Sequence, residues 1–231
     1  MLQATALTKQ YGAYTALHGL DLTVNKGEIF CMLGQNGAGK TTTVNIFLGF
    51  TAATSGTAAI NGKVVSTADP ITRKYTAYIP EVVMLYSHFT GLENLDFFSR
   101  LAGNAYKRGM LEQYLSQAGL QPSAFHQRVG TYSKGMRQKV GIAIALAKHA
   151  DVVFMDEPTS GLDPKATSEF TDIVKALGEQ GKSVFIATHD IFNAVNLATT
   201  IGIMKEGRLV HTLQVSDIDA AELQKIYLEM I

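Results

Sequence analysis

Short apolar runs separated by turn residues fill about the first 80 positions of the 231-residue chain. Gly19, Asn25 and Gly27 interrupt the apolar residues at intervals that suit strands joined by tight turns. The Asn61-Gly62 pair between two apolar pieces is typical of a two-residue hairpin turn. The pattern therefore predicts strands at residues 2–7, 15–24, 29–33 and 75–79, and a hairpin over 58–64.

The pattern changes to helix from about residue 82. Leucines and aromatic residues recur at three- and four-residue spacing over 92–101 and 107–119, which predicts two amphipathic helices. Gly103 and Gly119 are suitable helix stops. The apolar run 140–147 is far shorter than the ~18 residues that a membrane helix needs, so it predicts a buried helix.

Strands and helices alternate again from residue 151. Such alternation favours a parallel sheet with helical crossovers, which makes the chain an α/β protein. The Glu206-Gly207 pair should turn a closing hairpin. The predicted strands are 151–155, 183–187 and 200–204, and the predicted helices are 165–180, 190–198 and 220–230.

A glycine-rich segment, Gly34-Gln35-Asn36-Gly37-Ala38-Gly39-Lys40-Thr41-Thr42, joins the strand predicted at 29–33 to a helix that continues to about residue 49. It fits the phosphate-binding pattern G-x-x-x-x-G-K-[ST] between strand and helix. Its backbone N–H groups and the helix N-terminus would hold a polyphosphate. Lys40 would bind the β- and γ-phosphates, and the Thr41 hydroxyl would ligate Mg²⁺. The alternative is an ordinary glycine turn, which the flanking elements disfavour.

Two further motifs suit the same chemistry. Asp156-Glu157 ends a predicted strand, where an acidic residue beside a phosphate loop commonly holds Mg²⁺. Asp156 is the expected metal carboxylate, and Glu157 could polarise a water. The second motif is Ser133 to Gly135 before the helix at 140–147, which is either an ordinary N-cap or a second anion-binding helix end. Its position shortly before Asp156 favours the second interpretation.

Composition excludes some partners and compartments. The 20 basic and 20 acidic residues balance, whereas a nucleic-acid-binding protein usually carries a basic excess, so no nucleic-acid partner is expected. The single cysteine, Cys31, is expected to be a small core residue in a reducing compartment. The N-terminus lacks the pattern of a signal peptide. A role at a membrane would therefore require another chain to span it.

With these motifs in order, the chain resembles the nucleotide-binding subunits of ABC transporters from Ala6 to its last helix. The family signature Leu-Ser-Gly-Gly-Gln has its counterpart in Tyr132-Ser133-Lys134-Gly135-Met136, a variant that resembles an exporter branch. The resemblance implies a phosphate-loop NTPase core over about 1–81 and 151–231. It also implies an N-terminal antiparallel β subdomain and an inserted helical subdomain over about 82–150 that carries the signature. All would form a single ATP-binding domain over 1–231.

Other positions match the family motifs residue by residue. The resemblance makes Tyr11 the aromatic that stacks on adenine, Asp163 in Ser160-Gly161-Leu162-Asp163 a residue that shapes the dimer interface, and His189 the switch histidine. Each has a plainer alternative. Tyr11 could be a surface or core tyrosine, the segment at 160–164 a turn into the next helix, and His189 a core histidine. The other five histidines show no metal-ligand spacing.

The chain departs from the family at Glu81, where the family usually has a glutamine that ligates Mg²⁺. A carboxylate is also a suitable Mg²⁺ ligand, so Glu81 is expected to bind the metal with Thr41 and Asp156. The residues after Glu81 up to Tyr86 are unusually apolar for a loop. They form either the docking site of a transmembrane permease subunit, as the resemblance implies, or part of the helical core.

The implied function is ATP hydrolysis at a head-to-tail dimer interface, with Mg²⁺ as cofactor. Glu157 would act as the general base, His189 would brace the γ-phosphate, and residues Ser133 to Met136 would contact ATP bound by the second subunit, an identical or paralogous chain. The dimer would sit on the cytoplasmic face of the membrane and power a permease, and export is the expected direction. The last helix resembles the usual end of the family, so no appended regulatory domain is expected. The alternatives are a soluble ABC-type switch in translation or DNA maintenance, and a kinase on another phosphate-loop fold.

Overall fold

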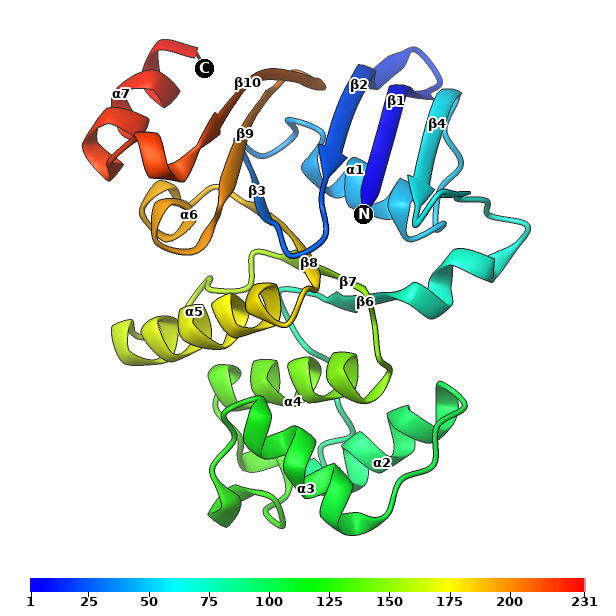
Figure 1. Cartoon of the computed structure of the whole chain (residues 1–231), viewed down its shortest axis with the longest axis vertical. Coiled ribbons are helices and arrows are strands. Elements are labelled where there is room, and N and C mark those ends of the chain that lie inside the picture. Colours follow the sequence, from blue (N-terminus) through cyan, green and yellow to red (C-terminus); the bar gives the residue numbers. More distant parts are fainter. Residues whose placement is uncertain (231) are drawn as a thin grey trace.

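The computed structural model describes residues 1–230 and contains two sheets (Figure 1). The smaller sheet is antiparallel, with the strand order β2-β1-β4-β5. The larger sheet has the order β10-β9-β3-β8-β7-β6, and its strands are parallel except for β10. The strands are β1 (Leu2–Tyr11), β2 (Tyr14–Val24), β3 (Ile29–Gly34), β4 (Ser55–Ile60), β5 (Lys63–Val64), β6 (Thr76–Ile79), β7 (Val152–Asp156), β8 (Ser183–Thr188), β9 (Thr200–Lys205) and β10 (Arg208–Gln214).

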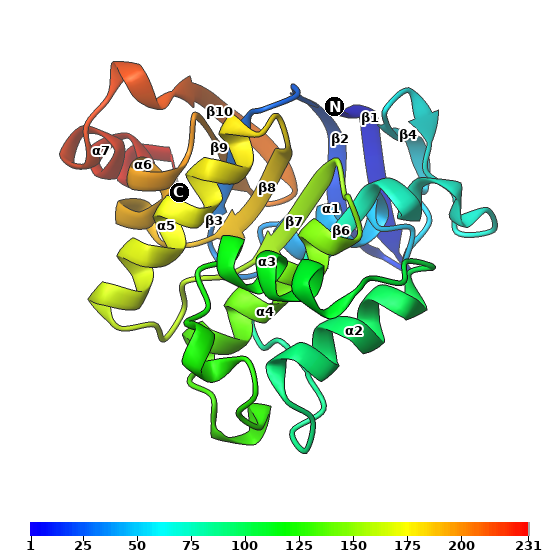
Figure 2. The same ribbon diagram turned by 60° about the horizontal axis from the view of Figure 1, so that its bottom comes forward.

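The helices divide into those that cover the sheets and those that form a separate lobe (Figure 1). Helix α1 contacts strands of both sheets, α5 packs on β8, and α6 packs on β3 and α7. Helices α2, α3 and α4 pack on one another and form the helical lobe (Figure 2), and α4 also contacts β6 and α5. The α-helices are α1 (Lys40–Phe47), α2 (Gly91–Leu101), α3 (Arg108–Gln117), α4 (Lys134–Ala147), α5 (Pro164–Glu179), α6 (Ile191–Leu197) and α7 (Ala220–Met230). None of them, over residues 1–230, has the length and apolarity needed to cross a membrane.

Side chains on the two faces of the parallel sheet belong to two apolar clusters. One cluster extends to the small sheet and α1, and it contains the stacked rings of Phe30 and Phe185, whose centroids lie 5.6 Å apart. The other extends to the helical lobe and includes Cys31, which is 1% exposed. Burial raises the pKa of the Cys31 thiol, so the core interpretation of this cysteine is confirmed. Because both faces are covered, β3 and β8 are buried along their whole length.

Most predicted elements are confirmed. The helix predicted at 140–147 begins earlier, at Lys134, and the other main differences lie in the small sheet. β1 continues to Tyr11 instead of ending at Leu7, because its residues beyond Leu7 pair with β2 up to the Tyr11–Tyr14 turn. β4 begins at Ser55, before the hairpin predicted at 58–64, because Ser55 and Thr57 pair with β1. Gly56 within it has a φ of 73°, a conformation that breaks the regular alternation seen by pattern analysis. Both predicted turns, Asn61-Gly62 and Glu206-Gly207, have positive φ at both residues.

Residues 82–86 divide between the two predicted environments. Val83 is 9% exposed and belongs to the core of the helical lobe. Its methyl groups pack against Gly141 of α4, where they would lie 3.5 Å from a Cβ on that glycine. Val82 is 56% exposed and Met84 is 79% exposed. The expectation of a docking surface is therefore wrong for Val83, whose side chain points into the lobe, and stays open for Met84.

Aspartate substitutions at these neighbouring positions should separate the two environments. Val83→Asp places an unpaired carboxylate in an apolar cluster and is expected to lower the free energy of unfolding by about 3 kcal/mol. Met84→Asp is the matched control and should change it by less than about 0.5 kcal/mol, since the side chain is exposed. Urea denaturation of the two purified variants measures both values. Equal destabilisation would contradict the assignment of Met84 to the surface.

Candidate functional site

The glycine-rich loop lies where the sequence predicts it, between β3 and α1. Two of its glycines are required by close backbone approach. A Cβ at Gly34 would lie 2.6 Å from the carbonyl oxygen of Met204, and one at Gly39, whose φ is 105°, would lie 2.8 Å from that of Ala16. Any other side chain there would displace β9 or β2. The loop therefore packs closely against one strand of each sheet, β9 and β2.

Lys40 is the first residue of α1 and is 6% exposed. Its Nζ donates to the carbonyl oxygens of Gly34 at 2.6 Å and Gln35 at 3.1 Å, so the ammonium group lies inside the curve of the loop. Burial lowers the pKa of Lys40, while the carboxylates of Glu157 and Asp156 oppose that shift. The site thus contains a cation that the protein neutralises only in part, which suits an anionic ligand.

Asp156 and Glu157 lie at the carboxyl end of β7, beside β8. Burial raises the pKa of Asp156 most, the adjacent Glu157 raises it further, and Lys40 and a hydrogen bond with Thr41 oppose the rise. Asp156 is therefore close to both predicted partners in the loop. The sequence-based grouping of Lys40, Thr41, Asp156 and Glu157 at one edge of the sheet agrees with this arrangement.

Two donors hold the Glu157 carboxylate. Nδ1 of His189 lies 2.7 Å from Oε1, and the Thr188 hydroxyl donates to Oε2 at 2.9 Å. Glu157 has a φ of 43°, an uncommon value for a residue other than glycine, and its N–H donates to the carbonyl oxygen of Ala187 at 2.9 Å. The side chain of His189 is 61% exposed, so the alternative of a core histidine is wrong.

Sequence reasoning missed the role of Thr188. Its hydroxyl donates to Glu157 and accepts a hydrogen bond from the Asp190 N–H at 3.1 Å, so it orients the carboxylate from the end of β8. A polar residue that ends an otherwise apolar strand beside Asp156-Glu157 was the available signal. Without the strand order, its neighbour across the sheet could not be identified.

Tyr11 is 46% exposed at the end of β1, so it is a surface residue, and Nζ of Lys9 lies 4.6 Å from the centre of its ring. A pocket of about 200 Å³ lies between Tyr11, Tyr14 and the glycine-rich loop. Its lining combines an exposed aromatic ring with residues Gln35 to Gly37 and Gly39 to Thr42, which suits a nucleotide.

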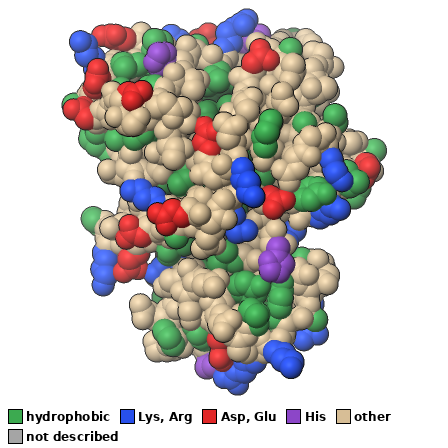
Figure 3. Space-filling model, viewed as in Figure 1, with side chains coloured by type: hydrophobic (Ala, Val, Ile, Leu, Met, Phe, Trp, Pro, Cys, Tyr) green, Lys and Arg blue, Asp and Glu red, His purple; other side chains and the backbone are tan. Residues whose placement is uncertain are grey.

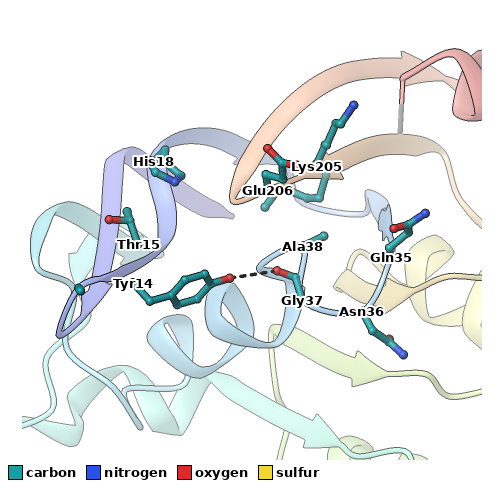
Figure 4. A pocket seen from close by; sticks show the side chains of 11 residues that line it. Tyr14, Thr15, His18, Gln35, Asn36, Gly37, Ala38, Lys205 and Glu206 are labelled. Carbon is teal, nitrogen blue, oxygen red and sulfur yellow. Dashed lines mark hydrogen bonds between the residues drawn. The ribbon is translucent and has the colours of Figure 1, made fainter.

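A second, larger pocket of about 620 Å³ lies beside the loop (Figure 4). Tyr14 points across it, and its hydroxyl donates to the carbonyl oxygen of Gly37 at 3.5 Å. His18 of β2 and Glu206 of the β9–β10 turn lie on the opposite side of the pocket from Asn36 (Figure 4). Sequence analysis singled out neither Tyr14 nor His18 for this site, because the close approach of the β9–β10 hairpin to β2 is a tertiary contact.

Ser133 is the N-cap of α4, with its Oγ accepting a hydrogen bond from the Met136 N–H at 3.2 Å. Ser133 is therefore confirmed as the N-cap of α4. That this helix end also contacts ATP bound by a second subunit stays a prediction. No residue of 132–136 lines either pocket beside the glycine-rich loop. Asp163 likewise caps α5, because its Oδ1 accepts a hydrogen bond from the Ala166 N–H at 2.9 Å.

Tyr132 anchors the start of α4. It is 5% exposed, and its hydroxyl donates to the carbonyl oxygen of Ala124 at 2.6 Å. Tyr132→Phe leaves that buried carbonyl without this donor, so the free energy of unfolding should fall by about 1–3 kcal/mol. Thermal or urea denaturation measures the effect. Tyr86→Phe, a change at a tyrosine that is 43% exposed, is the control. Unchanged stability in Tyr132→Phe would contradict the anchoring role.

Glu81 lies just beyond β6, and its Oε1 accepts hydrogen bonds from two other segments of the chain. It accepts hydrogen bonds from the Ser160 hydroxyl at 2.9 Å and from Nζ of Lys134 at 3.5 Å. The Ser160 hydrogen bond and the Lys134 charge hold the pKa of Glu81 below its usual range. The role of Glu81 as a Mg²⁺ ligand stays a prediction. The structure adds a contact with the signature segment that sequence analysis did not foresee.

The residues present fit a Mg²⁺-nucleotide. Within residues 1–230, no group of three His, Cys, Asp or Glu side chains gathers in the manner of an all-protein metal cage. Magnesium does not require such a cage, since it usually takes one or two carboxylates together with substrate phosphates and water. Asp156 and the Thr41 hydroxyl offer oxygen ligands for the metal beside the phosphate-binding loop, and the ammonium group of Lys40 offers a positive charge for the phosphates.

Comparison with known proteins identifies the family. Residues 17–160, more than half of the chain, match the family model described as ABC transporter. The bacitracin transport ATP-binding protein BcrA of Enterococcus faecalis is 35% identical over 219 residues, which cover 94% of this chain and 70% of BcrA. The fluoroquinolones export ATP-binding protein of Mycobacterium tuberculosis (strain CDC 1551 / Oshkosh) is 35% identical over 212 residues, which cover 91% of this chain and 69% of that protein.

Solved structures of ABC transporter cassettes share the fold. An ATP-binding subunit of an ABC transporter superposes with a TM-score of 0.82 at 28% identity, covering 99% of this chain and 98% of the other. The ATP-binding cassette MJ0796, solved as a dimer in a post-hydrolysis state with ADP and Pi, superposes with a TM-score of 0.81 at 26% identity, covering 93% and 99%. The chain therefore belongs to the ABC transporter family, as an ATP-binding subunit that hydrolyses ATP to drive transport.

Proposed function

We propose that two copies of this chain, or one copy and a close paralogue, meet head to tail and complete each ATP site between them. The observation that carries the proposal is the separation of two phosphate-binding features. The loop at 34–42 lines the pocket beside Tyr11, whereas Ser133 and Gly135 line neither pocket of their own chain. A second subunit can bring its helix end to the first subunit's γ-phosphate.

In this arrangement the chain's own groups position ATP and the attacking water. The Tyr11 ring would stack on adenine, and Lys40 would exchange its bonds to Gly34 and Gln35 for phosphate oxygens. The backbone N–H groups of the loop would hold the same phosphates. Mg²⁺ bound by Thr41, Asp156 and Glu81 would neutralise charge that develops on the transferred phosphoryl group.

Glu157 is proposed as the general base. Its carboxylate lies at the carboxyl end of β7, close enough to Lys40 that its charge opposes the fall in the pKa of Lys40. Thr188 would hold Oε2 throughout, while Oε1 would accept the proton of the attacking water. His189, now on Oε1, would move to the γ-phosphate when ATP binds. The step is a transfer of the phosphoryl group to water, so ADP and phosphate are its products.

The transmembrane partner is proposed to dock on the helical lobe, which we assign to about residues 82–150. Hydrophobic side chains gather on this lower lobe (Figure 3). Met84 and Leu101 are 79% and 74% exposed, and Tyr86 and Phe97 pack edge to face with ring centroids 5.0 Å apart. Such a surface suits the apolar face of a short helix from a permease subunit. The complex would sit on the cytoplasmic face of the membrane.

Export is the proposed direction of transport. The signature variant Tyr132 to Met136 supports it, as do two relatives, whose names assign one to fluoroquinolone export and one to linearmycin resistance. The linearmycin resistance ATP-binding protein LnrL of Bacillus subtilis (strain 168) is 33% identical over 214 residues. The molecule transported is decided by the permease, since that subunit encloses the substrate.

Affinity purification from detergent-solubilised membranes tests the proposal. The tagged wild-type chain is expected to retain a polytopic membrane protein, and Met84→Asp is expected to lose it while remaining folded. Phe50→Asp is the matched control, because Phe50 is also exposed but lies after α1, outside the helical lobe. Recovery of ribosomes or DNA in place of a membrane protein would overturn the assignment to an exporter.

A further inference from the structure

A polar contact links three segments at the boundary between the parallel sheet and the helical lobe. Glu81 follows β6, Ser160 lies in the loop after β7, and Lys134 is the first residue of α4. Oε1 of Glu81 accepts from both Ser160 and Lys134, at 2.9 and 3.5 Å. The side chains of Glu81 and Lys134 are 51% and 31% exposed, so the pair faces solvent and can open.

A nearby anion would stabilise the charge of Lys134. It occupies the positive end of α4, where the backbone N–H groups already favour negative charge, and the first turn of this helix contains no acidic residue. Within residues 1–230, the carboxylate found at ion-pair distance from its ammonium group is Glu81. A phosphate group brought to this helix end would satisfy the same charge.

Both charged residues of this pair stand at positions where the chain departs from the family pattern described above. Glu81 stands where the family usually has glutamine, and Lys134 stands where the signature usually has glycine. The positive charge of Lys134 is unfavourable at the positive end of a helix, and the negative charge of Glu81 offsets it. Together they neutralise each other within one subunit.

We propose that Glu81 is a positioning residue that forms an ion pair with Lys134 of its own chain before ATP binds. We call this ion pair the latch. When the dimer closes, the γ-phosphate bound by the other subunit takes the place of the Glu81 carboxylate beside Lys134. The inference rests on the proposed head-to-tail site, because only that arrangement brings a second phosphate to α4. On closure of the dimer, the ammonium group of Lys134 exchanges the carboxylate for phosphate, while Ser160 keeps a hydrogen bond to Glu81. The latch therefore opposes closure in the absence of ATP.

The first test measures the pair in the ATP-free chain. Acetylation of lysines by an N-hydroxysuccinimide ester, followed by mass spectrometry, reports how accessible and how strongly paired each amine is. Glu81→Gln keeps an oxygen for Ser160 but removes the charge, so Lys134 should react about two- to fivefold faster, the range expected for an exposed ion pair. This gain should shrink in 1 M salt.

The matched control is another ion pair of the same helix, Lys139 with Glu169, whose atoms lie 2.6 Å apart. Glu169→Gln should speed acetylation of Lys139 and leave Lys134 unchanged, whereas Glu81→Gln should do the reverse. Acetylation of Lys134 that does not respond to Glu81→Gln would overturn the latch.

The second test measures release of the latch. In the hydrolysis-deficient Glu157→Gln background, Glu81→Gln is expected to strengthen the ATP-dependent dimer about two- to fivefold in sedimentation experiments. In a background that also carries Lys134→Gln, the same change should have no effect, because the charge that Glu81 holds is gone. An equal effect in both backgrounds would overturn the latch and indicate that Glu81 acts through the metal or the phosphate alone.

The two tests separate this inference from the proposed function. A Glu157→Gln chain that forms no ATP-dependent dimer would overturn the head-to-tail proposal and the release step with it, even where acetylation shows the pair. A dimer whose stability ignores Glu81 would overturn the latch and leave the proposed function intact.

Discussion

Glu157→Gln is expected to reduce ATP turnover about 10²–10⁴-fold and to trap an ATP-dependent dimer. The amide cannot accept the proton of the attacking water, but it is nearly the same size as the carboxylate. Its oxygen can still accept from Thr188, which now donates to Oε2 at 2.9 Å. ATP should therefore bind and close the dimer, while the hydrolysis that reopens it is slow.

Release of phosphate from ATP measures turnover, and gel filtration with and without ATP measures the dimer. Glu169→Gln is the control, since Glu169 on α5 is another carboxylate with a basic partner but lines neither pocket beside the glycine-rich loop, and the change should leave turnover unchanged. A normal rate in Glu157→Gln would contradict the assignment of the base. His189→Ala should also lower turnover, because it removes the side chain that is proposed to move from Oε1 of Glu157 to the γ-phosphate.

Lys40→Ala is expected to weaken ATP binding about 10- to 100-fold and to abolish measurable turnover. Hydrogen bonds to charged groups contribute about 1.5–3 kcal/mol each, and the ammonium group is the buried cation at the loop. The variant also leaves the carbonyl oxygens of Gly34 and Gln35 without their present donor, so the empty loop loses part of its support. ADP should lose less affinity than ATP, because it lacks the γ-phosphate.

Fluorescence titration with a labelled nucleotide measures the affinities, and circular dichroism checks the fold. Lys148→Ala is a close control, since Lys148 is also partly buried and donates to a backbone carbonyl, that of Thr76, at 2.7 Å. It should reduce stability without changing the affinity for ATP. Equal loss of affinity in both variants would indicate that Lys40 acts only through the fold.

Local sequence patterns predicted those parts of the site that are made by one continuous segment. The loop at 34–42 is bounded by an apolar strand and a helix, and two of its glycines, Gly34 and Gly39, lie where backbone atoms of Met204 and Ala16 approach closely. Asp156-Glu157 follows a run of apolar residues that forms a buried strand. In both cases the motif and its structural context are adjacent in the chain, so pattern analysis can recognise them.

Contacts between distant segments could not be predicted in this way. Thr188 meets Glu157 because β8 lies beside β7, and Glu81 meets Lys134 and Ser160 because β6 is the edge strand next to α4. The same limit applies to residues 82–86, whose apolar character alone could not decide which side chains face the lobe. Strand order and helix packing decide these neighbours.

The sequence by itself determined the family, the element order, the phosphate-binding loop and the acidic residues, because each depends on the local periodicity or on a contiguous motif. The tertiary structure alone decided that Glu157 is held by Thr188 and His189, that Val83 is core while Met84 is exposed, and that Glu81 contacts Lys134. The physical reason is that pairing across a sheet and packing between lobes join residues far apart in the chain. Their geometry depends on the whole set of burial and hydrogen-bonding requirements.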